Sequence, residues 1–302
     1  MMQYTYYPGC SLHSAHKGYD ESCKSVFEAL GCSLQELPDW NCCGATIYMS
    51  NREFTSLAVA ARNLALAEAQ QQDLVAPCSA CYRVLNKSNH YFHNSGELLE
   101  KVNGCLAEAG LHYRGTVRVR HPLDVLINDV GLEIIRHQVK KPLHGLKIAN
   151  YYGCQIVRPE HVFDDCENPM TMDNLFESLG AENVYFPFKV SCCGGMLMTT
   201  TENVALRLSK EILENARENA ADCIVTTCPL CQMNLEAYQR RINRVYGTRL
   251  SMPILFFTQV MGVALGIDEK RLGISRNFYR CERLETIARS ASESHYATTV
   301  NA

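Results

Sequence analysis

Short apolar segments alternate with longer segments of helical spacing along this chain, and the alternation predicts an α/β fold. In the first half, strands are predicted at residues 3–9, 34–37, 74–76 and 116–120. Between the strands, apolar residues such as Phe54, Leu57 and Ala61 recur at intervals of three and four positions, which is the spacing of a helix with one buried face. Strands joined through helices predict small, mainly parallel sheets flanked by helices.

The second half repeats this order. Its strands are predicted at residues 147–152, 184–188, 223–227 and 254–257. A leucine followed by glycine is predicted to end one helix at Gly31 and another at Gly180, because glycine favours the left-handed conformation that closes a helix. The Lys-Lys-Pro-Leu-His-Gly segment at 140–145 is the best linker candidate. We therefore expect two domains, residues 1–143 and 144–302, with a flexible tail from about residue 290.

Helix boundaries are predicted from capping residues. Ser50 or Asn51 is expected to cap the helix that follows it, and Thr201 is expected to cap a helix in the second half. The polar segment 86–110 reads as helix, and another helical run begins at His121-Pro122.

Composition limits the function classes. The chain has 302 residues, of which 47% are hydrophobic, and a formal net charge of -3, with no basic patch that indicates nucleic acid. No stretch approaches about 18 uninterrupted apolar residues, so no membrane span is expected. The N-terminus lacks a signal-peptide pattern, and we expect a cytoplasmic protein. In that compartment, 16 cysteines indicate metal or redox chemistry rather than disulfides.

Ten cysteines fall into two sets with the same order: one cysteine, an adjacent pair followed by glycine, and a Cys-x-x-Cys. The first set is Cys10, Cys42, Cys43, Cys78 and Cys81, and the second is Cys154, Cys192, Cys193, Cys228 and Cys231. In both sets 34 residues separate the pair from the Cys-x-x-Cys. The offset between the sets is 150 residues at these positions and 144 at the first cysteine. Equal spacers across a helix and a strand indicate duplication, with two similar domains meeting face to face.

The cysteines are expected to converge, because each motif follows a predicted strand and ligands of open α/β sheets gather at the carboxyl ends of the strands. The Cys-x-x-Cys is expected where a strand turns into a helix, whose free N–H groups favour a thiolate or an anionic cluster. Gly44, Gly194 and Gly195 are expected to let the backbone approach inorganic sulfide closely.

Three interpretations of each set compete. A zinc site needs four ligands, usually from two spaced pairs, whereas each set has five cysteines. Adjacent cysteines on an extended backbone point to opposite sides, so both rarely reach one zinc ion. An iron–sulfur cluster removes this difficulty, because adjacent sulfurs can serve different irons. Zinc in one half, with the second site as the minor candidate, and free thiols remain the alternatives. A common cubane takes four cysteines, so a set of five indicates a non-standard cluster.

The two motifs resemble those of the cysteine-rich CCG-domain family, and more closely those of the B subunit of heterodisulfide reductase, of a bacterial or sulfur-oxidation type. The resemblance covers about residues 4–265, and the spacer of 34 residues is one shorter than the usual pattern. It implies that each set binds a non-cubane [4Fe-4S] cluster. It also implies that a disulfide is reduced or formed between the two clusters, either a coenzyme heterodisulfide or lipoate-bound or sulfane sulfur.

The resemblance further implies two partners. One is a small iron–sulfur (HdrC-like) subunit that delivers electrons, and beyond it lies a flavin-containing (HdrA-like) subunit. This chain has no G-x-G-x-x-G motif of its own for a nucleotide cofactor. Two other functions stay open: an electron-transfer module of a flavin-linked dehydrogenase, and a zinc-binding interaction scaffold.

Several residues near the motifs are weaker candidates. His13 and His16 are candidate proton donors, and His121 is either near the first cluster or a capping or core residue. Trp40 and Tyr48 flank the first pair and are expected to shield it or to form a substrate wall. Lys189 and Arg158 are candidates to attract an anionic substrate, whereas Met196 and Met198 are expected in the core. The remaining cysteines are expected to be buried free thiols: Cys23, Cys32, Cys105, Cys166, Cys223 and Cys281.

Overall fold

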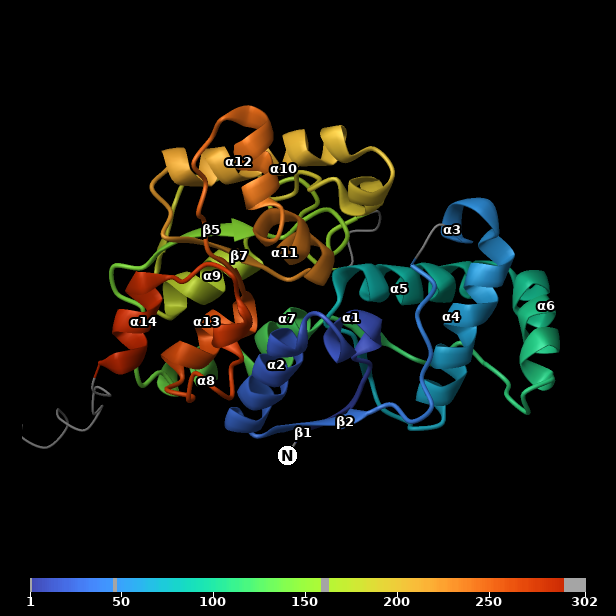
Figure 1. The fold of residues 1–302 in the computed structure, drawn as a ribbon. Coiled ribbons are helices and arrows are strands. Elements are labelled where there is room, and N and C mark those ends of the chain that lie inside the picture. Colours follow the sequence, from blue (N-terminus) through green and yellow to red (C-terminus); the bar gives the residue numbers. More distant parts are fainter. Residues whose placement is uncertain (1, 46–47, 159–162, 291–302) are drawn as a thin grey trace, which may run out of the picture.

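Two four-stranded sheets, each made only of parallel strand pairs and flanked by helices, form the framework of the chain (Figure 1). The computed structural model describes residues 2–45, 48–158 and 163–290. The expected α/β class and the duplicated parallel sheets are therefore confirmed. The expected flexible tail lies almost entirely outside the described residues.

The first sheet has the order β2-β1-β3-β4. Its strands are β1 (Met2–Tyr6), β2 (Cys32–Glu36), β3 (Leu74–Val75) and β4 (Val119–Arg120). The helices of this half are α1 (Gly9–His13), α2 (Lys17–Ala29), α3 (Tyr48–Asn51), α4 (Glu53–Glu68), α5 (Ser79–Asn94), α6 (Gly96–Ala107), α7 (Pro122–Val125), the π-helix η1 (Leu126–Val130) and α8 (Leu132–His137).

The second sheet repeats this topology with the order β6-β5-β7-β8. Its strands are β5 (Lys147–Tyr151), β6 (Glu182–Asn183), β7 (Cys223–Thr226) and β8 (Ile254–Phe256). The helical elements are α9 (Thr171–Ser178), the 3-10 helix η2 (Gly195–Thr199), α10 (Glu202–Glu218), α11 (Pro229–Glu236), α12 (Gln239–Tyr246), α13 (Phe257–Ala264), the 3-10 helix η3 (Ile274–Arg276) and α14 (Glu282–Arg289).

Most predicted elements are present, but several boundary predictions are wrong, including the Thr201 cap, because the Thr201 side chain makes no capping hydrogen bond to α10. The predicted helix 86–110 is two helices, because the Ser95 side chain accepts a hydrogen bond from the backbone N–H of Leu98 and starts α6. The residue before α4 is Arg52, not Ser50 or Asn51, and no side chain caps that helix. The strand predicted at 184–188 is β6, which ends at Asn183. The residues after it form the loop to the second Cys-Cys pair.

The strand order predicts where a ligand binds in each sheet. From β1 the chain crosses to β2 on one side, and then returns past β1 to β3 on the other. The usual ligand position in an open α/β sheet of this order is between the carboxyl ends of β1 and β3. The same crossing occurs between β5 and β7 in the second sheet.

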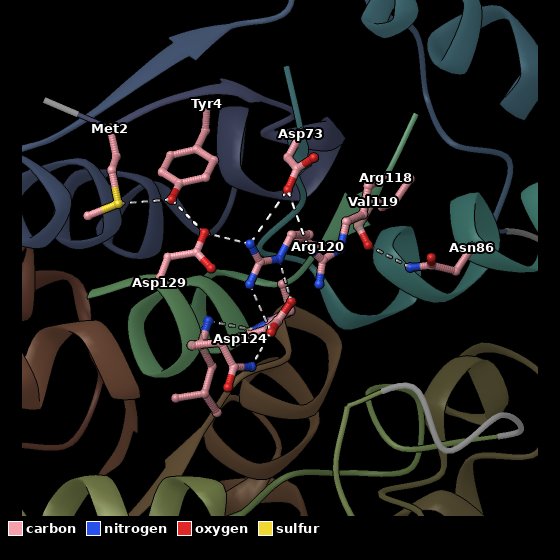
Figure 2. A network of polar contacts seen from close by, with 12 residues as sticks. Met2, Tyr4, Asp73, Asn86, Arg118, Val119, Arg120, Asp124 and Asp129 are labelled. Carbon is pink, nitrogen blue, oxygen red and sulfur yellow. Dashed lines mark hydrogen bonds and ion pairs between the residues drawn. The ribbon is translucent and has the colours of Figure 1, made fainter. Parts of the chain in front are cut away.

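A buried ion cluster holds β4 beside β3 (Figure 2). The Arg120 side chain is 2% exposed and contacts the carboxylates of Asp124 at 2.6 Å, Asp129 at 2.5 Å and Asp73 at 3.5 Å. Tyr4 of β1 donates a hydrogen bond to Asp129 at 2.7 Å. These contacts join two strands of the sheet to α7 and η1, and they fix the strand end from which His121 follows.

The two halves share a packed interface, in which α2 of the first half lies against α13 of the second (Figure 1). The rings of Tyr19 and Phe256 stack with their centroids 4.1 Å apart and an interplanar angle of 3°. The Ser22 and Thr258 hydroxyls lie 2.6 Å apart in the same buried contact. The two sheets are therefore held in one fixed relation, although the boundary between residues 143 and 144 stays a prediction.

Candidate metal centres

The first five-cysteine set lies beyond the carboxyl ends of β1, β2 and β3. Cys10 lies in α1, directly after β1, and the Cys42-Cys43 pair lies in the loop after β2. Cys78 is the residue before α5, and Cys81 lies in the first turn of that helix. The predicted strand-to-helix position of the Cys-x-x-Cys is confirmed here.

The second set occupies the same places in the second sheet. Cys154 follows β5, Cys192 and Cys193 lie in the loop after β6, and Cys228 precedes α11. Cys231 lies in the first turn of α11. The two sets are thus equivalent in topology as well as in spacing.

Adjacent cysteines of each pair reach different partners. The Sγ atoms of Cys43 and Cys81 lie 3.2 Å apart, and those of the equivalent Cys193 and Cys231 lie 3.6 Å apart. The other member of each pair contacts the first cysteine of its set, since Cys42 is hydrogen-bonded to Cys10 and Cys192 to Cys154. Each five-cysteine set therefore gathers from three loops.

Backbone N–H groups point at several of these sulfurs. The N–H groups of Gly194 and Gly195 lie 3.4 Å from the Sγ atoms of Cys192 and Cys193, respectively. The hydrogen bond from Cys154 lowers the pKa of the Cys192 thiol to about 6, and the Gly194 N–H acts in the same direction. The same hydrogen bond raises the pKa of the Cys154 thiol, so within this pair the negative charge is favoured on Cys192.

Two glycines that precede the first cysteines leave room for the sulfurs. A Cβ atom added at Gly9 would lie 3.1 Å from the Sγ atom of Cys81, and one added at Gly153 would lie 2.9 Å from that of Cys231. Both glycines have a φ angle of +67°. The role predicted for Gly44 and Gly194 stays a prediction. A Cβ atom at these glycines would meet Ser56 or Ala205 of the following helix.

A tyrosine hydroxyl fixes the loop of each Cys-Cys pair. Tyr7 donates to the Asn41 carbonyl at 2.6 Å, and Tyr151 donates to the Ser191 carbonyl at 2.7 Å. Burial raises the pKa of both phenols, so each hydroxyl keeps the proton that it donates. The sequence interpretation missed both tyrosines, although a repeated Tyr-x-Gly-Cys at residues 7–10 and 151–154 was the available signal.

The loops that carry Cys78 and Cys228 meet at the interface between the halves. The Ser79 hydroxyl, next to Cys78, lies 3.2 Å from both the carbonyl and the hydroxyl oxygen of Thr227, the residue before Cys228. A cavity of about 210 Å³ lies beside this contact. All five cysteines of the second set line it, together with first-half residues that include Ala45 and Ala80.

The five thiols of each set are chemically suited to an iron–sulfur group. Within the described residues, no three His, Cys, Asp or Glu side chains lie together as ligands of one metal ion. Sulfurs that gather in close pairs from several loops, with N–H donors and a cavity beside them, suit a cluster in which each iron takes only part of the set. Together the five cysteines of each set would hold it.

The histidine candidates lie at different places. His13 contacts Glu36 at 3.0 Å and packs against the Trp40 ring, outside the residues that line the cavity. His16 is buried and hydrogen-bonded to Gln232, and burial lowers its pKa to about 4, so the ring is neutral near pH 7. Their role as proton donors stays a prediction. The His121 side chain caps α7, and its Nε2 atom lies 2.9 Å from the Pro77 carbonyl oxygen. The predicted capping role of His121 is therefore confirmed.

Of the two basic candidates near the second set, Lys189 is paired with a carboxylate, whereas the role of Arg158 stays a prediction because a carbonyl oxygen does not cancel its charge. Lys189 pairs with Asp173 at 2.9 Å, and the Arg158 guanidinium donates to the Cys166 carbonyl at 3.0 and 3.1 Å. Met196 is 54% exposed and lines the cavity, so the expectation that it lies in the core is wrong, whereas Met198 is buried.

The remaining predictions concern shielding and free thiols. The Trp40 ring packs edge-on against the Tyr7 ring, with the two ring centroids 5.6 Å apart, and this position agrees with shielding of the first set. The Tyr48 side chain lies outside the described residues. Four of the six other cysteines are buried, but Cys105 is exposed and Cys166 is partly exposed, which contradicts the expectation for these two.

Comparison with known proteins identifies relatives over nearly the whole chain. The profile of the CCG family, described as a cysteine-rich domain, matches twice, at residues 4–86 and 148–236. An 8-methylmenaquinol:fumarate reductase membrane anchor subunit of Wolinella succinogenes is 34% identical over 93% of this chain and 99% of the relative. A protein of Archaeoglobus profundus, named as similar to the B subunit of heterodisulfide reductase, is 37% identical over 91% of this chain and 94% of the relative. The B subunit of the ferredoxin/F(420)H(2)-dependent CoB-CoM heterodisulfide reductase of Methanosarcina acetivorans is 32% identical over 92% of this chain and 94% of the relative.

A solved structure shares the fold. The crystal structure of a hypothetical protein from Helicobacter pylori superposes with a TM-score of 0.74 at 17% identity, over 92% of this chain and 52% of the other. Among the helices of the described residues, none has the length and apolar character needed to cross a membrane.

Proposed function

The chain belongs to the cysteine-rich CCG-domain family and is an iron–sulfur oxidoreductase subunit of the heterodisulfide reductase type, and from this premise we propose that it carries the catalytic site for an S–S bond. Each five-cysteine set would hold one non-cubane [4Fe-4S] cluster. The reaction takes a disulfide, two electrons and two protons to two thiols, or runs in reverse. The clusters, when bound, would supply the electrons one at a time.

One observation carries this proposal: one cysteine-bearing loop of each set lies at the interface between the halves. The Ser79–Thr227 contact joins the loops that hold Cys78 and Cys228. The cavity beside it takes its lining from both halves. We propose that a substrate in this cavity places one sulfur at the second set, with side chains of the first half around the rest of the molecule.

The residues of the chain prepare this site before any substrate enters. Tyr7 and Tyr151 hold the Cys-Cys loops, and Gly9 and Gly153 leave space for the opposing sulfurs. Apolar residues such as Met196 and Leu230 line the cavity. A preorganised site of this kind spends little free energy on reordering when it binds its substrate.

A second function is supported by the relative from Wolinella succinogenes. Its name describes a membrane anchor subunit of 8-methylmenaquinol:fumarate reductase, and the two chains match over nearly their full lengths. In the alternative, this chain is an electron-transfer module of a flavin-linked dehydrogenase, and the two sets pass electrons without an S–S substrate. The zinc-binding scaffold predicted as a third alternative would hold zinc in at least one set.

The partners follow from the same premise. For the disulfide reaction we propose that a small iron–sulfur subunit and a flavin-containing subunit are the source of electrons. The cytoplasmic localisation stays a prediction, because one relative is named a membrane anchor subunit.

Metal analysis and turnover together test the proposal. The chain purified without oxygen is expected to hold about eight irons and eight acid-labile sulfides, and to oxidise a reduced viologen dye when a disulfide is added. Zinc alone would overturn the iron–sulfur assignment. Full iron content with no disulfide-dependent oxidation, but with transfer to a flavoprotein partner, would favour the electron-transfer alternative.

A cysteine variant assigns the activity to the second set. Cys193→Ala is expected to lower the iron content by about half, since one of two clusters is lost, and to abolish the disulfide-dependent oxidation. Cys105→Ala is the matched control, because Cys105 is exposed and outside both sets. Activity that survives in Cys193→Ala would contradict a mechanism that needs both sets.

A further inference from the structure

The lining of the cavity beside the second set is almost uncharged apart from its cysteines. Ala45, Met49, Met196 and Leu230 provide apolar surface, and Gln155 provides an amide. Among the described residues that line the cavity, Arg83 is the one with a permanent charge. In such surroundings a guanidinium group attracts an anion more strongly than it would at an open surface, because less water screens the charge.

Arg83 is positioned by the first half, although the cavity holds the sulfurs of the second. It lies in α5, two residues after Cys81, and its side chain is partly buried. In the part of the chain that the structure describes, no carboxylate pairs with its guanidinium group. Lys87, one turn further along α5, pairs instead with Glu53 at 2.9 Å. The charge of Arg83 is therefore available to a bound molecule.

Only the first half has a charged residue at this position of the duplicated motif. Arg83 follows Cys81-Tyr82, and the equivalent residue after Cys231-Gln232 is Met233. The two halves thus provide similar cysteine sets but different side chains next to them. A substrate with an anionic group at one end would be oriented by this difference, and a symmetric neutral one would not.

We propose that Arg83 is a specificity-determining residue, which binds a carboxylate or phosphate group of the thiol or disulfide that enters the cavity. This inference rests on the proposed function, since it assumes that an organosulfur substrate occupies the cavity. The planar guanidinium group presents paired N–H donors that match either anion. The apolar lining would hold the stem between the anionic group and the sulfur.

Calorimetric titration of the purified, iron-loaded chain tests the inference without turnover. The probes are 3-mercaptopropionate, its uncharged amide and a phosphorylated thiol of similar length. The wild-type chain is expected to bind an anionic probe at least about tenfold more tightly than the amide, the effect of one charge-assisted hydrogen bond. The two anionic probes distinguish a carboxylate from a phosphate substrate. Arg83→Met is expected to abolish this preference, and Arg83→Lys to keep part of it, because an ammonium keeps the charge without the paired donors.

Arg244→Met is the matched control, because Arg244 is an exposed arginine on α12 that does not line the cavity. Its preference for the anionic probes should equal that of the wild type. An undiminished preference in Arg83→Met would overturn the inference, and so would equal affinities for all probes in the wild type. Loss of iron from Arg83→Met with the preference intact would also overturn it, and would assign Arg83 to the stability of the metal site.

The two proposals fail separately. A chain that reduces disulfides but ignores the charge of the probes keeps the proposed function and loses the role of Arg83. A chain that prefers anionic thiols through Arg83 but reduces no disulfide keeps the anion site and loses the proposed reaction.

Discussion

Single residues decide how closely the sulfurs of each set can gather. Gly9 and Gly153 precede the first cysteine of their sets, and the space where each Cβ atom would lie is next to a sulfur of the Cys-x-x-Cys. A side chain at either position would move the loop that carries Cys10 or Cys154. The two glycines are therefore part of the site, although neither would bind the metal.

We predict that Gly153→Ala lowers the iron content of the second set. The new Cβ atom would lie 2.9 Å from the Cys231 Sγ atom, and the positive φ angle would add strain. Gly247→Ala is the control, because Gly247 has the same φ angle of +67° but no atom within 4 Å of its Cβ position. Both variants are expected to lose about 1–2 kcal/mol of unfolding free energy to strain, and only Gly153→Ala is expected to lose iron. Equal iron in both variants would contradict the prediction.

Glu236 provides a pH dependence of stability. It is buried beneath the segment that follows η3 and accepts a hydrogen bond from the Phe278 N–H at 3.0 Å. Burial raises its pKa from 4.5 to about 7. Because the folded chain binds this proton more tightly than the unfolded chain, the contribution of Glu236 is full below pH 4.5 and is lost as the pH rises to about 7.

We therefore predict that Glu236→Gln removes this pH dependence. The difference in unfolding free energy between wild type and Glu236→Gln should change by about 3 kcal/mol between pH 4 and pH 8, in favour of the variant at the higher pH. Urea denaturation across this range measures it. The same difference for Glu218→Gln, at an exposed position on α10, should stay constant. A constant difference for Glu236→Gln as well would show that its carboxyl group titrates normally.

The sequence predicted the cysteines of the site but not which basic side chains are available there, and the difference has a physical reason. The ten motif cysteines stand out because a duplicated spacing is preserved in the order of the chain itself. The availability of a basic side chain depends on which acid packs beside it. Lys189 meets Asp173, which is 16 positions earlier, whereas Arg83 meets no such partner among the described residues. No local pattern distinguishes these two cases.

At the scale of elements, short strands depend on contacts outside themselves. β3 and β4 have two residues each, and the Arg120 cluster holds both of them to α7 and η1 (Figure 2). Their position matters to the first set, because Ala76 donates to the Arg120 carbonyl at 2.9 Å, just before Pro77-Cys78. The sequence predicted these strands from apolar residues, but the ion cluster joins residues up to 125 positions apart, which no local pattern indicates.

We predict that Arg120→Met destabilises the chain by about 3–5 kcal/mol, because it leaves the carboxylates of a buried ion cluster without their cation. Thermal or urea unfolding measures the change. Arg118→Met is the control, since the Arg118 side chain is 66% exposed and lies 4.0 Å from Asp73. Its effect should stay within about 0.5 kcal/mol. If both variants lose the same stability, the buried cluster does not hold these strands in place.

At the scale of the whole molecule, function depends on how the halves are joined. The sequence predicted two similar domains that meet face to face, and it could do so because duplication places both cysteine sets at equivalent edges. It did not indicate which helices would pack together. Helix α2 of the first half lies against α13 of the second (Figure 1). Beside this contact Tyr19 of α2 stacks on Phe256 at the end of β8, and the two residues are separated by most of the chain.

We predict that the two halves unfold in one cooperative transition and that the aromatic stack contributes to it. Phe256→Ala should cost about 3–5 kcal/mol of unfolding free energy, as expected for truncation of a buried aromatic ring. A double-mutant cycle with Tyr19→Leu should give a coupling of about 0.5–1.5 kcal/mol. Phe278→Ala, at a side chain that is 71% exposed, is the control and should change little.

The chain contains a probe for this test, since its single tryptophan, Trp40, lies in the first half. Its fluorescence should follow the same urea transition as the far-ultraviolet circular dichroism of both halves. Phe256→Ala lies in the second half but should shift the Trp40 transition to lower urea, because the interface transmits the loss. Separate transitions for the two signals, or a Trp40 transition that Phe256→Ala leaves unchanged, would mean that the halves are independent. The cysteine sets would then have no fixed distance from one another, and a reaction that needs both would lose its structural basis.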